Sequence, residues 1–214
     1  MALIVAGGKG ERMNSKIPKQ FLLLNNMPIL MHTINQFSEF EKIIVVLPDS
    51  QFEYWENICR KEKFKITHTL VKGGETRFQS VKNGLSKITS KCIVAIHDGV
   101  RPLITKILIN RLILATKKGI GVVPGLPIKD SVRKVYKNNS TNIDRKNIYQ
   151  VQTPQCFIST DIKNAYQQAL SENFTDDSSV LESANCKITI LLGEAKNLKI
   201  TTHEDLKMAE LFMQ

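Results

Sequence analysis

Apolar segments rich in β-branched residues alternate along the chain with longer segments in which apolar residues recur every three or four positions. The first pattern is typical of buried strands and the second of amphipathic helices. Strands are expected at residues 2–6, 43–47, 66–71, 93–97, 120–124 and 187–192, and helices at about 28–38, 50–62, 76–88, 105–117, 160–171 and 203–213. This alternation predicts a single α/β domain, residues 1–214, built on a doubly wound and mostly parallel sheet.

Two of the expected helices begin with capping signals. Thr76 stands three residues before Gln79, which is the spacing of a capping box. Thr202 precedes Glu204 and Asp205, two acids suited to a first helical turn. Both signals support the helix starts at about residues 76 and 203.

Residues 125–150 interrupt the alternation, because they contain no helical period. The segment DSVRKVY alternates polar and apolar residues, KNNSTN is a turn cluster, and NIDRKNIYQVQ resumes an extended pattern. We therefore expect a projecting β-hairpin arm at about 125–150. Its apolar residues are few, and an isolated hairpin is marginal in water, so packing against a second copy in a homodimer is expected.

Composition narrows the class of protein. The chain has 214 residues, of which 42% are hydrophobic and 23% charged, which is ordinary for a globular protein. No apolar run approaches the roughly 20 residues of a membrane helix, so no membrane partner is expected. The four cysteines form no C-x-x-C pair and have no histidine at zinc-like spacing. Reduced thiols and a cytoplasmic location are expected.

The formal net charge of +10 favours an anionic partner. Lysines supply 23 of the 30 cationic residues and are spread along the chain, so the seven arginines are more informative. Four of them, Arg12, Arg77, Arg101 and Arg145, fall beside glycines or turns. A basic nucleic-acid-binding protein is the alternative from another class. It is disfavoured because aromatic residues make up only 7% and no basic stripe interleaves with them.

The first expected strand runs directly into a glycine-rich loop, AGGKGERM from Ala6 to Met13, and PKQ follows at 18–20. The backbone N–H groups of such a loop bind anions, and Arg12 and Lys19 add positive charge. Glycines are expected here because side chains would block a close approach and because some φ angles are positive. The spacing matches neither a Walker A motif nor the dinucleotide fingerprint. A tight turn with solvated charges is the alternative.

Further motifs follow in order: GGETRFQSV at 73–81, HDGVRP at 97–102, QTPQ at 152–155, TDD at 175–177 and NLKIT at 197–201. With the first loop they resemble the polyol-phosphate cytidylyltransferases over essentially the whole chain. The resemblance is nearest to the enzymes of non-mevalonate isoprenoid synthesis that act on 2-C-methyl-D-erythritol 4-phosphate. It implies transfer of the cytidylyl group of CTP to that polyol phosphate. The ribitol-5-phosphate enzymes are the alternative, but KDSVR at 129–133 and TDDSS at 175–179 look less like them.

The resemblance also implies roles for single residues. Charge that develops on the α-phosphate would be stabilised by Arg12, Lys19 and Lys199, the last on a late strand. The resemblance implies nucleotide contacts, including recognition of the cytosine edge, for Ala6, Gly7, Gly8, Gly10, Gly74, Glu75 and Ser80. It implies polyol-phosphate contacts for Asp98, Arg101, Ser131, Arg145, Thr153 and Thr175. Arg77 would have a positioning role, with a solvated helix-start charge as its alternative.

The sequence around several of these residues also supports an interpretation that does not depend on the resemblance. Asp98 ends an expected strand at the sheet edge where such folds bind ligands. Mg²⁺ is expected as cofactor, held mainly by the triphosphate, and its direct contact with Asp98 is left open. His97, within an apolar strand, is expected to be a hydrogen-bonded core residue and not a base, since a phosphate monoester is already anionic. Arg145 on the arm would reach the partner's polyol phosphate or be solvated, and Thr153 has a turn-forming role as its alternative.

Overall fold

The computed structural model describes residues 1–8, 17–137 and 139–214. Its main sheet has eight strands in the order β10-β7-β11-β6-β1-β4-β5, and β12 also pairs with β7. The strands are β1 (Ala2–Val5), β4 (Ile43–Leu47), β5 (Thr69–Lys72), β6 (Ile93–Asp98), β7 (Ile120–Pro127), β10 (Tyr149–Val151), β11 (Gln155–Ile158) and β12 (Lys187–Leu192).

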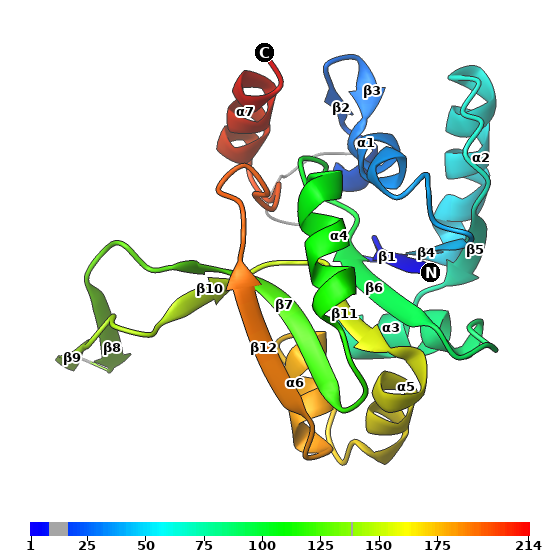
Figure 1. The fold of residues 1–214 in the computed structure, drawn as a ribbon. Coiled ribbons are helices and arrows are strands. Elements are labelled where there is room, and N and C mark those ends of the chain that lie inside the picture. The colour runs from blue at the N-terminus through cyan, green and yellow to red at the C-terminus, as the bar shows by residue number, and fades with distance from the viewer. Residues whose placement is uncertain (9–16, 138) are drawn as a thin grey trace.

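The centre of this sheet is parallel. Strand β1 pairs in parallel with β4 and β6, and β4 pairs in parallel with β5, so their carboxyl ends share one edge (Figure 1). Strand β12 is parallel to β7, whereas β11 runs antiparallel to β6 and β7, and β10 antiparallel to β7. The predicted α/β fold with a mostly parallel sheet is confirmed.

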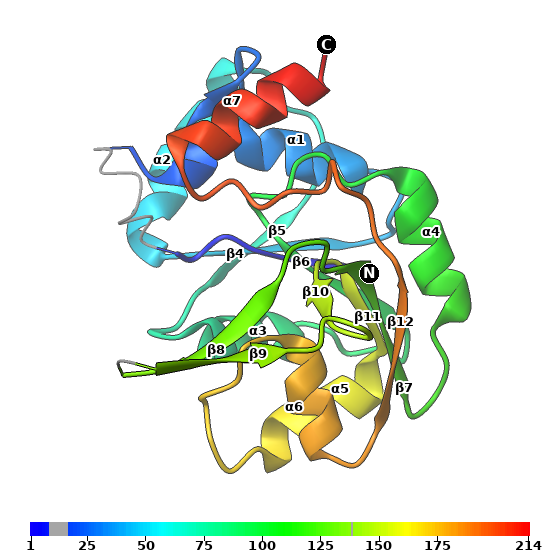
Figure 2. The ribbon, with the colours of Figure 1, turned by 90° about the vertical axis from the view of Figure 1, so that its left-hand side faces the viewer.

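Helices cover both faces of the sheet (Figure 2). On one face lie α1 (Ile29–Gln36), α2 (Phe52–Lys61) and α4 (Lys106–Ala115), and on the other lie α3 (Arg77–Ser86), α5 (Ser159–Gln168) and α6 (Asp177–Ser183). Each face has its own buried apolar cluster, one around Phe37 and Trp55 and the other around Phe78 and Phe157. Because apolar side chains are buried on both faces, the strands need continuous apolar sequences.

A third apolar cluster joins residues 22–29 to the C-terminal segment. Helix α7 (His203–Phe212) packs there with the short strand pair β2 (Leu23–Leu24) and β3 (Met27–Pro28). Two 3₁₀ turns complete the described elements, η2 (Lys19–Phe21) and η3 (Asp49–Gln51). The first of them places Lys19 beside the carboxyl edge of the sheet.

The expected helices and strands are present, but two details of the prediction are wrong. Strand β5 begins only at Thr69, and His68 instead accepts a hydrogen bond from the Trp55 indole at 2.8 Å. The segment NLKIT is not a strand, because β12 ends at Leu192 and Lys199 lies in irregular backbone before α7. A backbone hydrogen bond from Ile200 to the Val100 carbonyl ties this segment to the loop after β6.

The two helix caps differ. Thr76 accepts a hydrogen bond from the Gln79 N–H, but the Gln79 side chain accepts one from Glu75, so only half of the expected capping box forms. Thr202 and Asp205 form a reciprocal capping box at the start of α7. Both helices nevertheless begin where the caps indicate.

The arm consists of β8 (Val132–Tyr136) and β9 (Asn139–Ile143), which pair antiparallel and project from the sheet (Figure 1). Its base belongs to the main sheet, because β7 continues to Pro127 and β10 begins at Tyr149. The predicted hairpin within 125–150 is confirmed. On it, Val135 and Tyr136 are 70% and 50% exposed.

Two further sequence expectations concern the whole chain. All four cysteines are free thiols. Within the described ranges, no helix has the length and apolar character needed to cross a membrane.

Candidate active site

A cleft of about 830 Å³ lies at the carboxyl edge of the parallel strands. Its walls come from the ends of β1, β4 and β6, from η2 and η3, and from the segment that joins β5 to α3. Ligands of doubly wound sheets bind at this edge, and the volume suits a small molecule.

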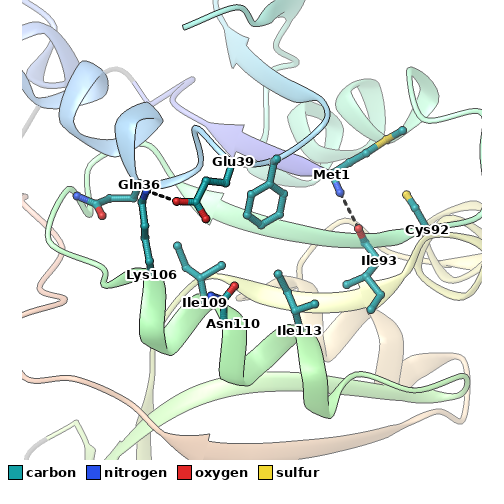
Figure 3. A pocket seen from close by; sticks show the side chains of 10 residues that line it. Met1, Gln36, Glu39, Cys92, Ile93, Lys106, Ile109, Asn110 and Ile113 are labelled. Atoms are coloured by element: carbon teal, nitrogen blue, oxygen red, sulfur yellow. Dashed lines mark hydrogen bonds and ion pairs between the residues drawn. The ribbon is translucent and has the colours of Figure 1, made fainter.

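A smaller hollow of about 380 Å³ lies near the amino ends of β1 and β6 (Figure 3). Its walls are mainly apolar, with Ile109 and Ile113 of α4 facing Ile93. The charged side chains that line it, Lys106 and Glu39, form an ion pair at 2.5 Å and neutralise each other. The α-ammonium group of Met1 also lines this hollow and donates to the Ile93 carbonyl at 2.8 Å. The lysines of the larger cleft therefore suit an anionic ligand better.

The glycine loop and two lysines form the cationic side of the cleft. Gly7, Gly8, Lys19 and Lys199 all line it. Neither of these glycines has a positive φ angle, and Gly10 of the same loop lies outside the described residues, so the expected positive φ angles stay a prediction for the rest of the loop. Among the described residues, a Cβ at Gly8 would meet no atom within 4 Å, and one at Gly7 would meet only the Ser80 hydroxyl at 3.4 Å. The absent side chains leave open space at the cleft, as close approach of a ligand requires.

The loop between β5 and α3 is held in one conformation by its own side chains. The Gly74 N–H donates to Ser80 Oγ at 3.0 Å, and the Glu75 N–H donates to Gln79 Oε1 at 3.0 Å. A Cβ on Gly74 would lie 2.3 Å from the Gln79 Cβ, so only glycine fits. Because Ser80 Oγ accepts a hydrogen bond, its O–H can still donate, and the loop offers fixed polar groups to a ligand.

Cationic side chains of the cleft gather around the carboxylate of Asp98. Its carboxylate lies 3.1 Å from Lys199 Nζ and 3.2 Å from Arg101 Nε, and Arg77 Nε lies 3.8 Å away. Burial by itself raises the pKa of Asp98, but these three cations, Lys199 foremost, lower the pKa well below its usual range. Asp98 is thus a permanent negative charge that fixes cationic side chains around the cleft.

Behind Asp98 lies a buried hydrogen-bonded chain. Thr153 Oγ1 accepts the Asp98 N–H at 3.0 Å and lies 3.0 Å from His97 Nδ1, while His97 Nε2 lies 3.0 Å from the Arg101 carbonyl. Burial lowers the pKa of His97 to about 4. His97 is confirmed as a hydrogen-bonded core residue. Thr153 is buried and braces the end of β6, so it does more than form a turn.

Arg77 is not a solvated charge. Its guanidinium donates to both carboxylate oxygens of Asp177, at 2.9 and 2.6 Å, and Tyr166 Oη donates to the same carboxylate at 2.6 Å. Burial by itself lowers the pKa of Arg77, but the charge of Asp177 outweighs it and raises the pKa. Neither partner was predicted from the sequence. The TDD motif was a signal for Asp177, whereas Tyr166 sits in an ordinary amphipathic helix.

The structure gathers most of the expected site residues but not all. The cleft is lined by the expected residues Ala6, Gly7, Gly8, Lys19, Gly74, Glu75, Arg77, Ser80, Asp98 and Lys199. Arg101 and Thr153 contact Asp98 from behind. Ser131 and Arg145 are exposed near and on the arm, where Arg145 donates to the Lys129 carbonyl, and Thr175 is exposed before α6. Gly10 and Arg12 lie outside the described residues.

The described residues do not fit a metal ion held by protein ligands. They include no cluster of three or more histidine, cysteine, aspartate or glutamate side chains suited to one. The carboxylate of Asp98 is already engaged by three cations. A divalent ion in this cleft would depend on phosphate oxygens and water, which Mg²⁺ accepts readily.

The doubly wound sheet has a cleft at its carboxyl edge that is lined by glycines, by two lysines and by the polar Gly74–Ser80 segment. These features are typical of nucleotide-binding α/β proteins of the nucleotidyltransferase class. The chain belongs to the 2-C-methyl-D-erythritol 4-phosphate cytidylyltransferase family, whose family model matches residues 1–214.

Curated relatives and solved structures agree with this assignment. The chain is 48% identical over 212 residues to 2-C-methyl-D-erythritol 4-phosphate cytidylyltransferase of Azobacteroides pseudotrichonymphae, covering 97% of this chain and 96% of the relative. The enzyme of that name from Bacteroides fragilis is 42% identical over 215 residues, covering 99% and 98%. The crystal structure of 4-diphosphocytidyl-2C-methyl-D-erythritol synthase from Anaerococcus prevotii matches with a TM-score of 0.83 at 30% identity, covering 100% and 97%. The family and fold expected from the motifs are confirmed.

Proposed function

We propose that this chain transfers the cytidylyl group of CTP to 2-C-methyl-D-erythritol 4-phosphate, giving 4-diphosphocytidyl-2-C-methyl-D-erythritol and pyrophosphate. The main support for this function is that one cleft is lined by the glycine loop, Lys19, Lys199 and the Gly74–Ser80 segment. The family match over residues 1–214 supports it and selects the polyol phosphate.

In this reaction a phosphate oxygen of the polyol attacks the α-phosphorus of CTP. A new P–O bond forms, the bond to the β-phosphate bridging oxygen breaks, and pyrophosphate leaves with that electron pair. Lys19 and Lys199 stabilise the charge that grows on the α-phosphoryl oxygens, and Arg12 is assigned the same role. No protein base is needed, because the attacking phosphate is already anionic. The buried, neutral His97 agrees with this.

The nucleotide is assigned to the glycine side of the cleft. Gly7 and Gly8 leave room for the phosphates, and the same role is assigned to Ala6 and Gly10. The Ser80 hydroxyl and the fixed backbone around Gly74 and Glu75 suit the polar edge of cytosine, since base discrimination needs donors and acceptors of fixed position.

The polyol phosphate is assigned to the side of the cleft that Asp98 forms. The Asp98 carboxylate suits the polyol hydroxyls. Arg101 donates to this carboxylate, and Thr153 accepts the Asp98 backbone N–H. Contacts from Thr175 and Ser131 are part of this proposal. Mg²⁺ would arrive on the triphosphate, where it would neutralise phosphate charge.

The proposal includes a homodimer formed through the arm. Val135 and Tyr136 are exposed on the hairpin, and burying them against a second copy would stabilise both arms. Arg145 is exposed beside β9 and is assigned to the phosphate of the polyol bound by the partner chain.

Pyrophosphate release tests the proposed function. The purified chain should release pyrophosphate from CTP with 2-C-methyl-D-erythritol 4-phosphate at least about tenfold more efficiently than with ribitol 5-phosphate, or about 1.4 kcal/mol of transition-state binding. Equal efficiencies, or the reverse order, would move the assignment to the ribitol enzyme. No release with either polyol would contradict cytidylyl transfer.

A further inference from the structure

Arg77 lies between two carboxylates that compete for its guanidinium. It is the first residue of α3 and lines the cleft. Its contacts with Asp177 are short and bidentate, at 2.9 and 2.6 Å, whereas its Nε lies 3.8 Å from Asp98 Oδ1. The Asp177 side chain is completely buried and that of Arg77 is 30% exposed. Arg77 is therefore held from behind and presents only part of its surface to the cleft.

Asp177 is itself fixed by the start of α6. The preceding residue, Asp176, caps this helix by accepting the Ser179 N–H at 3.0 Å, and also accepts from the Gln155 amide at 2.7 Å. Gln155, buried in β11, accepts in turn from the Ser178 N–H at 2.8 Å. These bonds attach α6 to the main sheet, beside the strand that carries Asp98.

Tyr166 completes the arrangement from α5. Its hydroxyl donates to Asp177 Oδ1, and its ring stacks on Phe78 of α3 at 4.6 Å between centroids. The carboxylate of Asp177 thus receives hydrogen bonds from two helices and is satisfied without solvent, as a buried charge must be.

Release of Arg77 from Asp177 would change the contacts of Asp98. Lys199 and Arg101 already contact Asp98 Oδ2 at 3.1 and 3.2 Å. A guanidinium released from Asp177 would be drawn fully onto Asp98, because a bidentate pair with a carboxylate is its preferred geometry. It would then displace or reorient Lys199, which the proposed reaction uses on the α-phosphate.

We propose that Asp177, supported by Tyr166, is a positioning residue that keeps Arg77 from closing on Asp98 and so leaves Lys199 correctly placed for cytidylyl transfer. This inference rests on the proposed function for its kinetic readout. It assigns no substrate contact to Asp177, which acts only through Arg77.

Two variants and a matched control test the inference by steady-state kinetics. Asp177→Asn keeps the shape of the side chain but removes its charge. The kcat of this variant should fall about tenfold or more, because small misplacements of catalytic groups are costly. Its Kd for CTP should stay within about threefold of the unaltered value. Tyr166→Phe keeps the stacked ring and should lower kcat by about two- to fivefold. Asp161→Asn removes a carboxylate of α5 that accepts the Gly119 N–H, and kcat should stay within about twofold.

A double-mutant cycle separates positioning from simple support of the fold. In an Arg77→Ala background, Asp177→Asn should change kcat by less than about twofold, because there is no guanidinium left to release. An equally large loss in that background would overturn the inference. So would Asp177→Asn and Tyr166→Phe enzymes that both retain kcat within about twofold.

An NMR measurement tests the placement of Arg77 without any measurement of enzyme activity. The Arg77 Nη–H signals in a ¹H–¹⁵N spectrum, assigned with Arg77→Lys, should exchange slowly in the unaltered chain, because both Nη groups donate to the buried Asp177 carboxylate, and should exchange faster in Tyr166→Phe, which is expected to fold. Unchanged exchange in Tyr166→Phe would overturn the inference even if Asp177→Asn does not fold. If the unaltered chain shows no transfer activity, the proposed function fails, while this spectrum still tests the placement of Arg77.

Discussion

At the residue scale, the site is an arrangement of cations around one carboxylate. Asp98 orders Lys199 and Arg101, and Asp177 restrains Arg77. Composition and motifs predicted which residues carry charge into the site. They did not predict the pairs, because Arg77 and Asp177 are 100 positions apart and are brought together by the packing of α3 against α5 and of α5 against α6.

His97 should make the stability of the protein depend on pH. Its pKa is about 4 in the folded chain against an ordinary 6.5, so the unfolded chain binds more protons between these values. The stabilisation is complete above pH 6.5 and is lost as the pH falls toward 4. Urea unfolding at pH 7 and pH 5 should show a loss of about 2 kcal/mol that His97→Gln lacks. Equal losses in both proteins would contradict a neutral buried His97.

Ser80 should contribute to the choice of base. Its hydroxyl is held by the Gly74 N–H and is buried at the cleft wall. CTP should be used more efficiently than UTP, and Ser80→Ala should narrow the ratio of their kcat/KM values by about tenfold, as loss of one discriminating hydrogen bond implies. An unchanged ratio would show that another group reads the base.

At the scale of elements, the apolar periodicity predicted the strands and helices that build the sheet, because these bury continuous or one-sided apolar sequences. Short elements with weak periodicity were not predicted. Helix α6 has seven residues and a polar start, and β11 has only four residues, directly before α5. NLKIT looked like a strand because its apolar residues alternate, yet Leu198 and Ile200 pack in the cluster around α7.

Close packing of α3 on β1 should make Gly84 sensitive to substitution. A Cβ there would lie 2.3 Å from Leu3 Cδ1 and 3.0 Å from Val46 Cγ2, and both of those side chains are fully buried. Gly84→Ala should therefore lower the free energy of unfolding by about 1–3 kcal/mol, despite the better helix propensity of alanine. The exposed Ser86→Ala in the same helix should change it by less than about 0.5 kcal/mol. Equal effects in urea titrations would mean that α3 has room at Gly84.

At the scale of the whole molecule, the main sheet positions the cleft while the arm extends away from it (Figure 1). The arm was predicted because residues 125–150 show no helical periodicity. The sequence also predicted that an arm with too few apolar residues to stand alone needs a partner, which stays a prediction. Where Arg145 acts depends on that partner, because its own chain holds it on an exposed segment.

Complementation between two damaged chains tests the arm. Lys19→Ala and Arg145→Ala chains should each be nearly inactive alone. If Arg145 serves the partner's site, each mixed dimer has one site with both residues intact. Random exchange should then restore about a quarter of the unaltered activity, since about half of the dimers are mixed. No recovery, with subunit exchange confirmed by mass spectrometry, would place Arg145 in its own chain's site or in none.

The central claim, that this cleft performs cytidylyl transfer through its lysines, is tested most directly by single-turnover kinetics of Lys19→Ala with CTP and 2-C-methyl-D-erythritol 4-phosphate. Lys106→Ala is the control, because Lys106 lies at the smaller hollow and pairs with Glu39. The Lys19→Ala enzyme should form product about 10²–10³ times more slowly while its CTP Kd changes by less than about threefold. The control should keep the unaltered rate. A Lys19→Ala rate within about threefold of the unaltered enzyme would contradict the account.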